Sequence, residues 1–147
     1  MKLTRFTDYS LRVLIHLGLQ ENSRVTIREI SRSYGISRNH LMKVVSQLTR
    51  MGYLDARRGP GGGIALARPA SNICLADVVT DMENNLNIVE CFGAEQECVI
   101  APVCELKCIL GQALSAYIST FRKYTLADLL APKAELCRRR KISKRTA

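Results

Sequence analysis

The sequence contains no apolar segment long enough to cross a bilayer. Its longest uncharged stretch, residues 108–121, is too short for a membrane-spanning helix and includes the polar residues Gln112 and Ser119. No apolar run follows Lys2 and Arg5, so the start of the chain has no signal-peptide pattern. We therefore expect a soluble, cytoplasmic protein that has no membrane partner.

Short motifs that would indicate other functions are also missing. The six cysteines include no Cys-x-x-Cys pair, which excludes zinc ribbons and thioredoxin-like redox sites. The glycine-rich segment around Gly59 and Gly61 is not followed by Lys-Ser/Thr, as in a phosphate-binding loop, and it lacks the third glycine of a dinucleotide-binding motif. Because no acid–base pair stands out either, we expect a protein that is not an enzyme.

Charge is distributed unevenly along the chain. The net charge of the 147 residues is +9, but residues 1–66 contain 11 Lys/Arg against 4 Asp/Glu. Residues 67–136 contain 5 against 9, and residues 137–147 contain 6 against none. A basic first part, an acidic middle and a basic tail are typical of a nucleic-acid-binding domain joined to a module with another task.

Helix-start signals in the basic part are well defined. An amphipathic pattern predicts a first helix over residues 7–19, with Thr7 or Asp8 near its start. Thr26 and Glu29 then have the spacing of a capping box, in which the hydroxyl and the carboxylate satisfy free backbone N–H groups. A second helix is therefore predicted to start here.

The second and third helices together indicate a helix-turn-helix. Gly35 can adopt the left-handed conformation that ends a helix, and Ser37 can cap the next helix over residues 38–50. That third helix is the expected recognition helix in the major groove of double-stranded DNA. The alternative is an ordinary three-helix bundle with a solvated face. The candidate DNA-contacting residues are Thr26, Ser37, Arg38, Asn39, His40 and Lys43.

A glycine-rich hairpin follows the third helix. Residues 53–58 and 64–66 read as two strands around a turn, which is the expected wing of a winged helix. The two arginines at the end of its first strand can reach phosphates or the minor groove of DNA. Its glycines allow close approach to the DNA backbone. The candidate contacts are Arg57, Arg58, Gly59, Gly61 and Gly62. We therefore predict a mainly α fold with a small β wing, and a winged helix-turn-helix DNA-binding domain over residues 1–68.

The rest of the chain reads as a linker and short helix (69–83), a cysteine loop (84–104), two helices (105–130) and a basic tail. The short helix is expected over residues 73–82, with Cys74 as a small buried residue in it. Apolar residues recur at helical spacing over residues 105–124, and a second copy of this helix is the natural cover for so long a stripe. A homodimer is therefore expected. The tail, residues 131–147, is expected to be disordered.

Three cysteines fall within fourteen residues of the loop. Cys91, Cys98 and Cys104 are spaced as Cys-x6-Cys-x5-Cys, and thiolates on one irregular segment can converge on one soft metal centre. Three ligands are one fewer than the usual four of an iron–sulfur cluster. A fourth ligand therefore has to come from elsewhere. Cys108 lies one helical turn beyond Cys104 and is one candidate.

Over residues 1–130 the chain resembles the family of winged-helix iron–sulfur regulators. The resemblance is specific because four motifs carry it together. They are Leu3-Thr4-x-Phe6-Thr7-Asp8-Tyr9-x-Leu11-Arg12, Tyr34-Gly35-Ile36-Ser37-Arg38-Asn39-His40-Leu41-x-Lys43-Val44-Val45, Arg58-Gly59-x-x-Gly62-Gly63-Ile64, and the three cysteines.

What the resemblance implies depends on the branch of the family. Regulators of iron–sulfur assembly carry a histidine ligand three residues after the last cysteine, whereas this position holds Lys107. The better match is to the nitric-oxide-sensing branch, in which the fourth ligand is an aspartate near the amino terminus of the other subunit. Asp8 matches that aspartate and is preferred over Cys108. Taken on its own, Asp8 would be read as an acid favoured by a helix dipole.

The expected function is a dimeric transcriptional repressor that binds a pseudo-palindromic operator and releases it when nitric oxide reacts with the cluster. A 4Fe–4S cluster is favoured over 2Fe–2S on resemblance alone. The alternatives are a regulator of iron–sulfur assembly or redox state, a structural zinc site, and, from another class, a small electron carrier. The operator sequence, the target genes and the roles of Cys74, Cys108, Cys137 and the basic tail cannot be read from the sequence.

Overall fold

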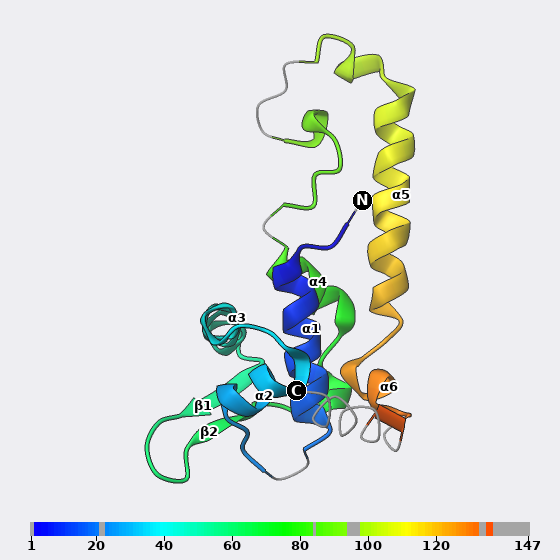
Figure 1. Ribbon diagram of the computed structural model, residues 1–147. Coiled ribbons are helices and arrows are strands. Elements are labelled where there is room, and N and C mark those ends of the chain that lie inside the picture. Colours follow the sequence, from blue (N-terminus) through cyan, green and yellow to red (C-terminus); the bar gives the residue numbers. More distant parts are fainter. Residues whose placement is uncertain (1, 21–22, 84, 94–97, 133–134, 137–147) are drawn as a thin grey trace.

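The computed structural model describes residues 2–20, 23–83, 85–93, 98–132 and 135–136, and is mainly helical with one two-stranded sheet (Figure 1). Two parts are visible: a head that contains the first three helices and the hairpin, and an arm formed by the long helix and the segment running alongside it. In chain order the helices and strands are α1 (Arg5–Gly18), α2 (Ile27–Tyr34), α3 (Arg38–Arg50), β1 (Leu54–Arg57), β2 (Gly63–Leu66), α4 (Leu75–Met82), α5 (Glu105–Arg122) and α6 (Leu126–Leu130).

Helix α1 begins at Arg5, two residues earlier than predicted. The cause is Thr4, whose extended backbone and side-chain oxygen cap the helix by accepting a hydrogen bond from the Thr7 backbone N–H at 3.2 Å. Thr7 is therefore a buried residue inside the first turn rather than the start of the helix. Asp8 stays in the first turn, as the sequence indicated.

The helix-turn-helix is confirmed in its local detail. The Thr26 side chain accepts from the Glu29 N–H, and the Glu29 carboxylate accepts from the Thr26 N–H at 2.7 Å, so the capping box is complete. Gly35 takes the left-handed conformation (φ 66°) at the end of α2, where a side chain would be disfavoured. Ser37 caps α3 by accepting from the His40 N–H. Helix α3 has the bounds predicted from the sequence.

The wing is an antiparallel hairpin that gains a third partner at its base. Strand β1 pairs with β2 so that Leu54 lies opposite Leu66 and Arg57 opposite Gly63. Val25, just before α2, forms a bridge with Ile64 in which each N–H donates to the other residue's carbonyl at 2.9 Å. Both strands lie where the sequence predicted them; the first was predicted one residue too long at each end, and the second one residue too short at its start.

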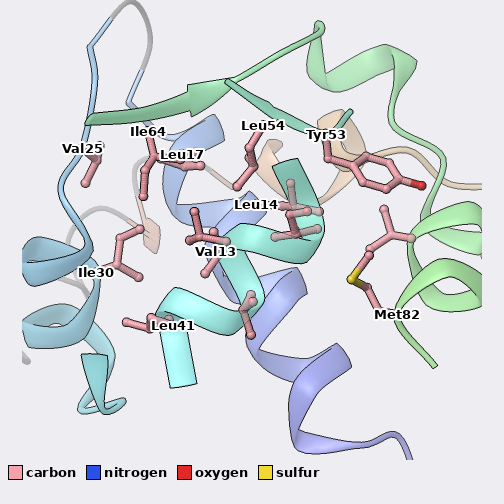
Figure 2. Close-up of a cluster of buried hydrophobic side chains, with 14 of the residues drawn as sticks. Val13, Leu14, Leu17, Val25, Ile30, Leu41, Tyr53, Leu54, Ile64 and Met82 are labelled. Carbon is pink, nitrogen blue, oxygen red and sulfur yellow. The ribbon is translucent and has the colours of Figure 1, made fainter. Parts of the chain in front are cut away.

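A single apolar core holds the head together. Figure 2 shows side chains from α1, α3, the wing and α4 meeting in it. Val13 and Leu14 of α1 are completely buried and pack beside Leu41 of α3. Ile64 brings the wing into the same cluster, and Met82 brings α4 into it. Burial of these side chains fixes α3 and the wing relative to each other, which positions both for a common ligand.

The start of α4 is tied by backbone pairing to the segment between α5 and α6, at the base of the arm. The Leu75 N–H donates to the Tyr124 carbonyl at 3.0 Å, and the Leu126 N–H donates to the Ile73 carbonyl at 2.8 Å. This pairing keeps Ile73 and Cys74 extended, so α4 starts at Leu75 rather than at Ile73 as predicted. Cys74 is half-buried at the N-cap position, not a fully buried residue within the helix.

Tyr53 joins the wing to α4 and provides a test of this packing. Its ring is buried, and its hydroxyl donates to the Asp81 carboxylate at 2.6 Å. Burial, and secondly the bond to Asp81, raise the pKa of Tyr53, so it stays protonated at neutral pH. Tyr53→Phe should lower the free energy of unfolding by about 1–2 kcal/mol, because a half-buried carboxylate loses its donor. Urea denaturation would measure this, with Tyr124→Phe, at an exposed tyrosine, as the control.

The arm consists of α5 and the cysteine segment, residues 84–104, of which 85–93 and 98–104 are described. In Figure 1 the last described part of this segment, residues 98–104, leads into the amino-terminal end of α5, which lies far from the wing. Helix α5 packs on α4 through its lower part. None of the helices among the described residues is long and apolar enough to span a membrane. Of the basic tail, residues 133–134 and 137–147 lie outside the described residues, so the prediction of disorder there stays a prediction.

Candidate nucleic-acid interface and cysteine segment

One face of α3 presents polar and basic side chains to solvent. Arg38, Asn39, His40 and Lys43 are all exposed, whereas Leu41 on the opposite side is completely buried. The His40 ring lies beside the ring of Tyr9 on α1, with centroids 6.2 Å apart. The first turns of α3 are therefore held by the core and free on the side where base edges could be read.

Thr26 and Ser37 have structural roles that the sequence already indicated. The Thr26 hydroxyl is used in the capping box of α2, and the Ser37 hydroxyl caps α3. Both residues are exposed, so their oxygens sit at helix amino termini where a phosphate would be attracted by free N–H groups and the helix dipole. Their contact with DNA stays a prediction.

The two arginines of the wing differ in their surroundings. Arg57 is paired with Asp55, its Nη2 lying 3.1 Å and its Nε 3.2 Å from one carboxylate oxygen. Arg58 is exposed and makes no ion pair or hydrogen bond that the structure shows within the described part of the chain. Gly59 and Gly61 have positive φ in the turn beyond, and the Gly62 N–H closes it by donating to the Gly59 carbonyl at 2.9 Å. Arg58 is therefore the arginine with the greater freedom to meet a phosphate.

A groove of about 700 Å³ separates α3 from the wing. Its floor is apolar, with Val45 and Ile64, and its rim carries Arg57 and Arg58. Met42 and Ser46 also line it, and the sequence reasoning missed both. The signal was there, because they lie four and eight residues after Arg38 and so share its side of the helix. The groove has the position in which the DNA backbone would lie between a recognition helix and a wing.

The cysteines lie on the arm, well away from this groove. Cys91 and Cys104 are half-buried and Cys98 is exposed, and none of the described cysteines forms a disulfide. The Phe92 ring, next to Cys91, lies against α5 at Gly111, where an added Cβ would be 3.9 Å from Cζ. This contact places the middle of the cysteine segment against the helix, and Cys104 ends the segment as the N-cap residue of α5.

The candidates for a fourth ligand lie on different elements. Cys108 is exposed in the first turn of α5, one turn from Cys104. Between them, the Lys107 backbone N–H donates a hydrogen bond to the Cys104 carbonyl. Asp8 lies on α1 and is paired with Arg12, with 2.7 Å between Nη2 and the carboxylate. Both side chains of this pair are partly exposed, so the ion pair is weak and open to exchange.

The donor set suits a soft metal centre. Three free thiols on one irregular segment are the ligands that iron–sulfur clusters take, and the exposed apolar side chains of Val99 and Val103 beside them would lower the local polarity. Within the described residues of one chain, the structure gathers no group of three or more Cys, His, Asp or Glu side chains at a metal-binding spacing. The chemistry of the thiols therefore fits a cluster, and their assignment as ligands stays a prediction.

Helix α5 divides the predicted apolar stripe into two. Leu110, Leu114, Tyr117 and Phe121 are half-buried, and these face the protein's own head and cysteine segment. A second row is exposed, with Leu106 60% and Ile109 59% accessible. Ala113 and Ala116 continue this row along the helix. The sequence reasoning treated both rows as one surface, and the structure leaves only the second without a cover among the described residues.

Comparison with known proteins supplies the family. A family profile described as Rrf2, an iron-dependent transcriptional regulator, matches residues 3–132. The HTH-type transcriptional regulator NsrR of Bacillus subtilis (strain 168) is 48% identical over 138 residues, covering 92% of this chain and 94% of that protein. NsrR of Geobacillus kaustophilus (strain HTA426) is 45% identical with the same coverage of each chain.

Solved structures show the same fold at lower identity. IscR of T. potens superimposes with a TM-score of 0.72 at 21% identity, over 88% of this chain and 86% of its own. CymR, the global cysteine regulator of B. subtilis, gives 0.70 at 21% identity, over 88% and 95%. The relatives named by sequence are transcriptional regulators and not enzymes, which agrees with the exposed recognition helix and wing. The chain belongs to the Rrf2 family of iron-dependent transcriptional regulators.

Proposed function

We propose that the protein is a homodimeric transcriptional repressor whose hold on DNA is controlled by an iron–sulfur cluster that reacts with nitric oxide. One observation supports the DNA-binding part. The polar face of α3 and the wing arginines lie on the same side of the head, with the groove between them. The cluster part is supported by the three free thiols and by the likeness to regulators named NsrR.

Two heads related by a two-fold axis would read two half-sites. The operator is then a pseudo-palindrome whose half-sites lie about one helical turn, or a multiple of it, apart. Arg38, Asn39, His40 and Lys43 are the proposed base-edge contacts, because they occupy the exposed first turns of α3. Selection from a randomised duplex pool would reveal the operator, and a selected sequence without two-fold symmetry would contradict the dimeric mode.

Arg58→Ala tests the wing. Because Arg58 is exposed and has no ion pair or hydrogen bond within the described part of the chain, we expect it to contact a phosphate. Its loss should therefore weaken binding and reduce the salt dependence by roughly one phosphate contact. Titrations of the selected duplex at several salt concentrations would measure both effects. Lys123→Ala, at the carboxy-terminal end of α5, removes the same charge and is the control. An unchanged affinity and salt slope in Arg58→Ala would remove the wing from the interface.

Cys91, Cys98 and Cys104 are the proposed cluster ligands from one subunit, with Asp8 of the partner subunit as the fourth. When bound, the cluster would supply an iron site that reacts with nitric oxide. An oxygen ligand is a harder and weaker partner for such iron than a thiolate, so the bond to the carboxylate is the labile one. Asp8 lies in the first turn of α1, and α1 packs directly on α3. Holding or releasing Asp8 would therefore bias the position of the recognition helix.

An anaerobic absorption spectrum, recorded together with DNA binding before and after addition of nitric oxide, tests the whole proposal. We expect a coloured protein that binds the selected duplex and loses both its original spectrum and its affinity on exposure to nitric oxide. A colourless protein containing zinc would contradict the cluster. A coloured protein whose affinity for the duplex depends on the supply of iron–sulfur clusters, but does not change with nitric oxide, would indicate the alternative, a regulator of iron–sulfur assembly. The 4Fe–4S form is proposed over 2Fe–2S, and Mössbauer spectroscopy would distinguish them.

A further inference from the structure

Arg24 lies in the short segment before α2 and reaches across to the wing. Its Nη1 donates to two backbone carbonyls, that of Asp55 on β1 at 3.1 Å and that of Gly63 on β2 at 3.0 Å. Its Nη2 is paired with the Asp55 carboxylate. One guanidinium therefore bonds to both strands of the hairpin at once, across 31 and 39 residues of sequence.

The backbone around Arg24 is shaped to permit this contact. Gly63 has a φ of +139°, and a Cβ placed there would lie 3.0 Å from the Cβ of Arg24 and 3.2 Å from the Val25 carbonyl oxygen. A side chain at Gly63 would therefore push the wing away from the segment before α2. The adjacent bridge between Val25 and Ile64 holds the same two segments together.

The contact also extends to a wing arginine. The Asp55 carboxylate that pairs with Arg24 is shared with Arg57, which lines the groove between α3 and the wing. The hydrogen bond from Arg24 lowers the pKa of Asp55, so this carboxyl is charged at neutral pH and can bridge the two guanidiniums. Arg24 has a side-chain accessibility of 21%, against 68% for Arg57, so Arg24 is the inner, structural member of the set.

We propose that Arg24 is a positioning residue for DNA binding: it locks the base of the wing to the start of α2, and so sets where Arg57 and Arg58 meet the DNA backbone. The proposal rests on the DNA-binding function proposed above. Arg24 acts through the wing and not through its own charge. A lysine keeps that charge but has a single nitrogen, which cannot serve three acceptors in the fixed directions of a guanidinium.

The first experiment compares Arg24→Ala and Arg24→Lys with the unaltered protein in binding the duplex selected from a randomised pool. Both variants should bind on the order of tenfold more weakly, the equivalent of one or two lost charge-assisted contacts. Lys123→Ala is the control for loss of one charge, and circular dichroism and thermal melting report whether each variant folds. If Arg24→Lys binds like the unaltered protein, charge alone is sufficient and the proposal is wrong.

A double-mutant cycle distinguishes positioning from direct contact. If Arg24 acts by placing Arg58, then Arg58→Ala should cost less affinity in an Arg24→Ala background than in the unaltered protein. Additive losses would contradict the proposal. Amide hydrogen exchange without DNA provides a reading independent of the proposed function: the Val25 and Ile64 N–H groups should exchange faster in both Arg24 variants, while those of α3 do not. If the Val25 and Ile64 N–H groups exchange as slowly in the variants as in the unaltered protein, Arg24 does not hold the base of the wing. The proposal is then wrong even if DNA binding is weaker.

If the unaltered protein fails to bind any selected duplex, the DNA-binding function itself has failed, and hydrogen exchange still decides whether Arg24 holds the wing. If the unaltered protein binds and the Arg24 variants bind equally well, the function stands and the inference fails. The two failures therefore give different results.

Discussion

Replacing Cys91, Cys98 or Cys104 singly by Ala is expected to leave the anaerobically purified protein with almost none of the visible absorbance of the unaltered protein. Each thiol is one of the three proposed soft ligands on the same segment, so its loss would leave iron to water or to a poor substitute. Absorbance and iron content measured per protein would record the loss. Cys108→Ala is the matched control, because this exposed thiol lies one turn away on α5 and is not assigned to the cluster.

Asp8→Ala is expected to differ from the cysteine variants. A cluster held by three thiolates can still assemble, with water or a small thiol in the fourth position, so the spectrum should change rather than vanish. In the unaltered protein, Asp8 would have to leave its ion pair with Arg12 to bind the cluster. That pair is partly exposed and holds Asp8 only weakly. If Cys108→Ala bleached the protein and Asp8→Ala did not alter it, the ligand assignment would be wrong. The proposed connection from the cluster to the partner's head would be lost with it.

Ile109→Asp is expected to weaken the proposed dimer. Ile109 is 59% exposed in the uncovered row of α5, beside Leu106 and Ala113, so a partner helix seated on this row would bury the new carboxylate without a counter-charge. We expect the dissociation constant to rise at least about tenfold, which corresponds to about 1.4 kcal/mol. Sedimentation velocity over a range of concentrations would measure it.

Ser115→Asp is the control for this experiment, since Ser115 is exposed on a different side of α5 and gains the same charge. Leu114→Asp gives a further comparison, because Leu114 is half-buried against its own chain. That change should lower the stability of each subunit as well as affect association. An Ile109→Asp protein that remains dimeric would place the subunit interface elsewhere.

The parts of the fold that depend on local chemistry could be predicted from the sequence. Thr26, Glu29, Gly35 and Ser37 each act within four residues along the chain, so their types and spacing were sufficient to place α2 and α3. The wing was also readable, because its glycines and the apolar and basic residues that flank them form one contiguous pattern.

Long-range contacts could not be predicted. Arg24 looked like an ordinary basic residue, and its three acceptors belong to strands more than thirty residues away. The division of α5 into an inner and an outer row depends on where α4 packs, which the periodicity of α5 alone does not contain. For the proposed cluster, the residue types predicted the chemistry of the donors, whereas Asp8, the proposed fourth ligand, lies on a different element from the cysteines and would act from a second subunit.

The backbone pairing of Ile73 with Leu126 and of Leu75 with Tyr124 has a consequence for how the molecule is assembled and modified. Because of this pairing, the cysteine segment and α5 form one long excursion from the head. The chain leaves the head and returns to it at the same place. The helices and hairpin of the head are formed by contacts close in sequence, whereas this closure carries the entropy cost of a long loop, so it should form late in folding. Changes in the length of the excursion leave its two anchor points unaltered. Evolution could therefore lengthen or shorten the arm without rebuilding the DNA-binding head.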